Sequence, residues 1–109
     1  MLAGAAGFAG AGSVAEAHVV LLGDSVFDNA AYVGGGPDVV RHLRAALGAG
    51  HRATLAAVDG ATIADVPHQL AGVPAEATAL VVSAGGNDAL AEAAVLDALG
   101  LAPEPVKEF

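Results

Sequence analysis

The sequence predicts a three-layer αβα domain on a doubly wound, flavodoxin-like parallel sheet, with about three βα units present. Three short apolar runs, at 18–22, 53–58 and 78–83, are each followed by a turn containing Gly with Asp or Asn, and then by a stretch with helical spacing. The runs are continuously apolar rather than alternating, which is typical of strands buried on both faces of a parallel sheet. We expect right-handed crossovers and the strand order second, first, third.

The length of 109 residues allows one domain with a thin core, because 28 of the apolar residues are alanine. The chain divides into an Ala/Gly-rich lead at 1–17, a domain at 18–102 and a tail without periodicity at 103–109. The lead lacks the basic start of an export signal and the long apolar run of a membrane span. We therefore expect no membrane span and leave the localisation open, with the cytoplasm favoured.

Helix boundaries follow from proline, glycine and charge. The first helix is expected to begin near Pro37 and Asp38 and to end at Gly48 or Gly50. The second is expected to begin close to Asp65, because a proline two residues later does not fit a helix interior. The third is expected at 88–99, closed by a glycine.

Charge and composition exclude several classes of function. A net charge of -8 repels the phosphates of nucleic acid, so no nucleic-acid partner is expected. The chain has no cysteine, and therefore no disulfide, thiolate cluster or cysteine nucleophile. Asp24 and Asp28 alone make a weak ligand set, so neither a metal nor another cofactor is predicted.

The chemistry-bearing residues follow the three predicted strands, in the loops at 23–29, 59–62 and 84–88. In doubly wound sheets these loops form the site. Ser25 is placed like a nucleophile at the end of a buried strand. The backbone N–H groups of Ser25 and Gly60 and the side-chain amide of Asn87 are candidate donors to an oxyanion.

The segments Val-Val-Leu-Leu-Gly-Asp-Ser at 19–25, Phe-Asp-Asn at 27–29, Gly60 and Gly-Gly-Asn-Asp at 85–88 together resemble the SGNH (GDSL) hydrolase family over residues 18–99. The resemblance implies an esterase-like enzyme that cleaves ester or acyl bonds of a small molecule through a serine acyl-enzyme. It assigns Ser25 as the nucleophile, and Gly60 and Asn87 as parts of the oxyanion hole.

The sequence departs from that family because it lacks the Asp-x-x-His block that supplies the general base. His18 and His51 precede strands, at the end of the sheet opposite Ser25, and His42 lies on the solvent side of a helix. The pattern does not predict where the His68 side chain points. All four histidines are interpreted as surface residues. The chain resembles the N-terminal half of the family domain, and we expect it to be inactive alone.

Simpler interpretations stand beside these roles. Ser25 can be a turn serine, Gly60 a tight-turn glycine, and Asn87 a helix cap with Asp88 beside it. Phe27 and Tyr32 are equally well read as walls of a crevice or as ordinary packing residues. The alternative function is a flavodoxin-like module that binds a small ligand or nucleotide without catalysis, and a third is a truncated product without activity.

The third strand has no predicted neighbour on its outer side. Its backbone N–H and C=O groups would form a flat apolar edge, which is a site of strand pairing between molecules. We therefore expect marginal folding or self-association through this edge.

Overall fold

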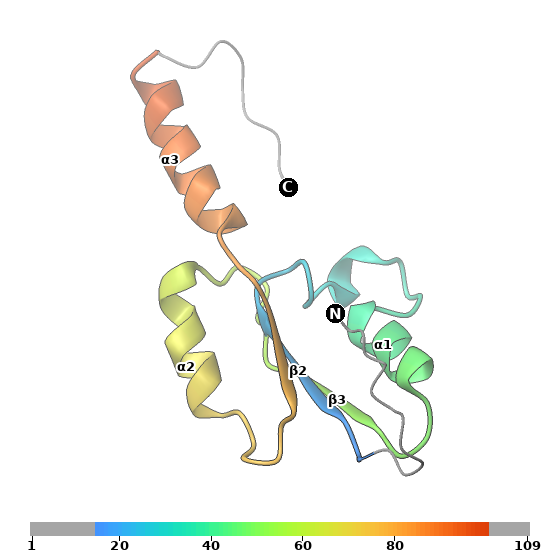
Figure 1. Cartoon of the computed structure of the whole chain (residues 1–109). Helices are drawn as coiled ribbons and strands as arrows, with labels where there is room; N and C mark the ends of the chain where they lie inside the picture. The colour runs from blue at the N-terminus through green and yellow to red at the C-terminus, as the bar shows by residue number, and fades with distance from the viewer. Residues whose placement is uncertain (1–14, 101–109) are drawn as a thin grey trace.

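The computed structural model describes residues 15–100 and confirms the predicted fold class (Figure 1). A three-stranded parallel sheet has the order β3-β2-β4, with β2 (His18–Gly23) between β3 (Arg52–Leu55) and β4 (Ala79–Ser83). The helices are α1 (Val39–Leu47), α2 (Val66–Ala71) and α3 (Gly86–Ala98), with short 3-10 turns η2 (Ala30–Tyr32) and η3 (Ile63–Asp65). The lead at 1–14 and the tail at 101–109 lie outside the described residues.

The core lies on the central strand. Val20 and Leu22 of β2 are completely buried, and Leu21 packs with Val40 of α1 and Ala53 of β3 in one cluster. The helices α1 and α2 lie on opposite sides of the sheet, which gives the three layers (Figure 1). Small residues such as alanine let these layers approach closely, so the core is compact but thin.

Helix α1 begins close to the predicted position, but its first residue is Val39 and not Pro37. Asp38 is its N-cap, with a side chain that accepts a hydrogen bond from the Arg41 N–H at 3.2 Å. Gly48 ends the helix with a φ of 80°, a conformation that favours glycine. Pro37 therefore precedes the cap and is not itself helical.

Helix α2 starts at Val66, and Pro67 occupies its first turn, where a missing N–H costs little. Helix α3 begins two residues earlier than expected, because Gly85, with a φ of 121°, is its N-cap. Asn87 is therefore inside the first turn of α3, and its interpretation as the cap is wrong.

The third βα unit differs from the other two because α3 leads away from the sheet instead of packing on it (Figure 1). No residue of α3 is buried, and Val95 and Leu99 are 51% and 65% exposed. Strand β4 is equally uncovered, with its apolar side chains about half exposed. No helix within residues 15–100 is long and apolar enough to cross a membrane.

The charges are unevenly distributed along the fold. The arginines at 41, 44 and 52 belong to α1 and β3, whereas residues 53–100 contain six acidic side chains and neither Lys nor Arg. Arg52 bonds Glu16 at 3.0 Å and approaches Glu76 at 3.6 Å, so it ties together the segments that precede β2 and β4. Within residues 15–100 the α3 side is consequently acidic, and the arginines lie on the β3 side.

Candidate functional site

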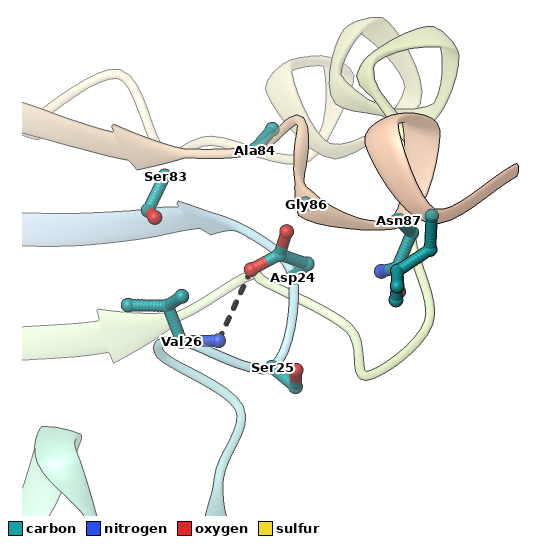
Figure 2. Close-up of a pocket in the computed structure, with 8 residues that line it drawn as sticks. Asp24, Ser25, Val26, Ser83, Ala84, Gly86 and Asn87 are labelled. Carbon is teal, nitrogen blue, oxygen red and sulfur yellow. Dashed lines mark hydrogen bonds between the residues drawn. The ribbon is translucent and has the colours of Figure 1, made fainter. Parts of the chain in front are cut away.

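A pocket of about 170 Å³ lies at the carboxyl ends of β2 and β4 (Figure 2). It contains two of the three predicted site residues, Ser25 after β2 and Asn87 on α3. Its lining residues are Asp24, Ser25, Val26, Ser83, Ala84, Gly86, Asn87 and Leu90. Gly60 is not among them. The sheet therefore brings the hydroxyl and the carboxamide to one pocket, with the Gly60 loop next to it.

The turn that presents Ser25 is fixed by Asp24. Its carboxylate is buried, and Oδ1 accepts a hydrogen bond from the Val26 N–H at 3.0 Å (Figure 2). The Asp24 N–H donates to the Ser83 carbonyl at 3.0 Å, and its own carbonyl accepts from the N–H groups of Phe27 and Asp28. Asp24 thus holds the backbone around Ser25, while the Ser25 hydroxyl has no hydrogen-bond partner among residues 15–100.

Gly23 is the residue that lets this turn pass close to β4. Its φ is 122°, and a Cβ built there would lie 1.8 Å from the Ser83 carbonyl oxygen. No side chain fits such an approach. The glycine that the resemblance places before Asp-Ser is thus required by backbone contact.

Gln69 on α2 also holds this turn. Its Oε1 accepts from the Gly23 N–H at 2.7 Å, and its Nε2 donates to the Gly23 carbonyl at 2.9 Å. One side chain therefore satisfies both polar groups of a backbone unit 46 residues away in sequence. A polar residue on a short helix gives no sequence signal for this contact.

The first turn of α3 is joined to the loop that carries Gly60. The Asn87 Nδ2 donates to the Ala61 carbonyl at 2.8 Å, and the Asp88 Oδ2 accepts from the Ile63 N–H at 3.0 Å. Asp88 therefore caps the neighbouring η3 turn and not the helix in which it lies. Gly60 has a φ of 89° in a tight turn closed by the Ala61 N–H and the Val58 carbonyl at 3.0 Å.

None of the four histidines lines the pocket. His42 and His68 are exposed on α1 and α2, and His51 accepts a hydrogen bond from the Ala17 N–H at 3.0 Å. The interpretation of His18 as a surface residue is wrong. It is 3% exposed, with Nε2 at 2.7 Å from Thr54 Oγ1 and with Nδ1 lacking a partner among the described residues.

The two aromatic candidates lie away from the pocket lining. Phe27 packs against the core cluster, which favours its interpretation as a packing residue. Tyr32 is 64% exposed, and its hydroxyl donates to Asp59 Oδ2 at 2.7 Å. The Asp59 N–H in turn donates to Asp28 Oδ2 at 2.7 Å, so these side chains join the first loop to the second.

Comparisons with protein families, curated proteins and solved structures find no match for this chain. In the part of the chain that the structure describes, no three His, Cys, Asp or Glu side chains are grouped so that they could hold a metal ion.

Proposed function

We propose that this chain carries the nucleophile and oxyanion site of an SGNH-type serine hydrolase that cleaves an ester or acyl bond. The single observation that supports this most strongly is the shared pocket of Ser25 and Asn87. A hydroxyl without another partner and a side-chain amide at one site are the groups needed for attack on a carbonyl and for stabilising its oxygen.

The bond between Asn87 and Ala61 supports the donor role of the carboxamide. A side-chain amide nitrogen carries two hydrogens, and the Ala61 carbonyl accepts one of them. This contact fixes the amide plane and leaves the second N–H for the substrate oxygen. Preorganised donors of this kind lower the barrier because they need no reorientation during the reaction.

Gly60 enters the proposal as a second donor through its backbone N–H. The Asn87 and Asp88 bonds hold its loop against α3, and a Cβ built on Gly60 would meet nothing within 4 Å. The open surface at this residue leaves room for a ligand that spans from the pocket to the loop. Gly60 therefore remains a candidate donor beside the pocket.

The proposal also requires a general base for Ser25, and none of the four histidines lines the pocket. The carboxylate that does line it, Asp24, is buried and accepts the Val26 N–H, so it is assigned to holding the turn. A serine hydroxyl is a weak nucleophile unless a base accepts its proton. We therefore expect the chain to show little turnover alone and to respond to a base supplied in solution.

The size and lining of the pocket favour a small acyl group. Its volume of about 170 Å³ is below the roughly 300 Å³ at which pockets for drug-sized ligands begin. Val26, Ala84 and Leu90 supply apolar surface in the pocket that Ser25 also lines. We propose a short acyl ester as the substrate class.

Labelling of Ser25 by a fluorophosphonate in the presence of imidazole tests the mechanism. Imidazole takes the hydroxyl proton, the Ser25 oxygen bonds to phosphorus, and fluoride leaves. We expect imidazole-dependent modification of Ser25 by peptide mass mapping, none in Ser25→Ala, and about 10²- to 10³-fold slower labelling in Asn87→Ala.

Asn29→Ala is the matched control for the asparagine, because the Asn29 carboxamide accepts from the Val39 N–H at 3.0 Å and lies outside the pocket lining. Its labelling rate should equal that of the unmodified chain. The mechanism fails if Ser25 is not labelled at any imidazole concentration, or if Asn87→Ala reacts as fast as Asn29→Ala.

The binding-module alternative is less well matched to the pocket. Its lining includes the buried Asp24 carboxylate and neither Lys nor Arg, so a phosphate-bearing ligand would meet a like charge without a cation. Saturable binding of a nucleotide in calorimetry, together with unlabelled Ser25, would favour that alternative.

We also propose that the chain self-associates through the outer edge of β4. Leu80, Val81 and Val82 are 49%, 42% and 54% exposed, and among residues 15–100 the only strand that pairs with β4 is β2, on one side. An uncovered apolar edge strand is a template for pairing with another chain.

A further inference from the structure

The two edge strands of the sheet differ in whether their outward-facing backbone groups have hydrogen-bond partners among residues 15–100. In β3 the Arg52 N–H donates to the Ala17 carbonyl, so the backbone groups of Arg52 point toward the central strand. Backbone groups alternate in direction along a strand, and the carbonyl of Ala53 therefore points to the outer side. There the Nε of Arg44, on α1, donates to the Ala53 oxygen at 3.0 Å. A charged helix side chain thus occupies the outer edge of β3, which protects it from another strand.

The outer edge of β4 has no such protection among residues 15–100. The Thr78 N–H donates to the His18 carbonyl, so by alternation Ala79 and Val81 present their N–H and C=O groups away from β2. No described side chain bonds to these groups, and the strand itself has no charged residue. The β4 edge is therefore neutral, apolar and open.

We infer that self-association is a closed two-fold pair, in which β4 pairs antiparallel with β4 of a second copy to form one six-stranded sheet. The inference rests on the self-association proposed above. A two-fold contact uses the same surface on both partners, so the open β4 edges satisfy each other. Both outer strands of the joined sheet are then β3, where Arg44 blocks further addition.

The register follows from the direction of the backbone groups. Val81 is central in β4 and faces outward, so its N–H and C=O can both bond with those of Val81 in the second copy. The opposed segments carry no charge, so the contact itself adds no like-charge pair despite the net charge of -8. A head-to-tail arrangement would instead set β4 against the edge that Arg44 occupies, and would not close.

Sedimentation of the full chain from about 1 µM to about 1 mM tests the stoichiometry. We expect a mass that rises from 10.5 kDa for one chain to twice that value and then stays constant. A monomer at every concentration would overturn both the pair and the proposed self-association. Larger species that grow without limit would keep self-association but overturn the closed pair.

Two variants of Val81 test the edge. Val81→Pro removes the outward N–H and leaves the bonds to β2 in place, and Val81→Lys sets two charges opposite each other. Each should raise the dimer Kd at least about tenfold while the far-ultraviolet circular dichroism is unchanged, whereas Val58→Lys, at a residue 54% exposed elsewhere, should not. A folded Val81→Lys that dimerises as tightly as Val58→Lys would exclude this edge.

The role of Arg44 is tested by a variant that should form assemblies larger than the dimer. Arg44→Met frees the Ala53 carbonyl, so the joined sheet should grow beyond two copies. Arg41→Met removes a charge from the same helix without freeing a strand carbonyl, and should stay dimeric. If Arg44→Met also stops at two copies, Arg44 does not close the assembly and the inferred device is wrong.

Discussion

Replacing Gly23 by alanine should be the most damaging single-methyl change in the described fold. The new Cβ would lie 1.8 Å from the Ser83 carbonyl oxygen and 2.6 Å from its carbon, so β4 must move away from the central strand. A φ of 122° adds backbone strain of about 1–3 kcal/mol, and forced overpacking adds about 1–3 kcal/mol. The expected loss in the free energy of unfolding is therefore about 2–6 kcal/mol.

Gly48→Ala is the control that separates the steric contact with Ser83 from the backbone strain. Gly48 also has a positive φ, of 80°, but a Cβ there meets nothing within 4 Å, so only the strain of about 1–3 kcal/mol applies. Urea unfolding followed by circular dichroism at 222 nm gives both free energies. If Gly23→Ala loses no more than Gly48→Ala, the close approach of the turn to β4 does not constrain residue 23.

Two further predictions concern side chains that hold the loops. Gln69→Leu leaves the Gly23 N–H and carbonyl without their partners, and should lower the free energy of unfolding in urea by about 2–3 kcal/mol. It should also speed hydrogen exchange of the Gly23 amide. Gln69→Glu keeps the acceptor and should lower the free energy of unfolding less. Hydrogen bonds from the Thr62 backbone N–H, then the Thr62 hydroxyl, lower the pKa of the exposed Asp65 below its ordinary value of 3.8. A lowered folded-state pKa stabilises the fold above 3.8, and this stability is lost as the pH falls through the folded-state pKa. Thr62→Ala removes the hydroxyl and keeps the backbone N–H, so carbon NMR titration should show the Asp65 pKa nearer to 3.8 but still below it. An unchanged pKa would contradict the part assigned to the hydroxyl.

The strands and the first helix could be predicted because their signals are local. The apolar runs at 18–22 and 78–83 match β2 and β4 within one residue at each end. The run at 53–58 is longer than β3, because the N–H groups of Ala56 and Ala57 both turn toward the Leu21 carbonyl and end the strand early. The amino-acid composition of the run does not indicate that bend.

The contacts that assemble the candidate site could not be predicted, because they join residues distant in sequence. Asp88 looks like a cap for its own helix, and only the fold brings it to the Ile63 N–H. His18 looks exposed at a strand start, but the parallel register places Thr54 beside its ring. The shared pocket of Ser25 and Asn87 could be predicted because each lies in the turn or helix start that follows a strand, and the carboxyl ends of parallel strands meet at one edge.

The separation of charge described above gives the molecule a permanent electric dipole. Three guanidinium groups lie at one side of the sheet, and the segment from β4 through α3 carries carboxylates alone. On a cationic surface the chain should settle with α3 downward, which leaves β3 and its arginines pointing into solution. Immobilisation on an anion exchanger would accordingly orient every copy the same way.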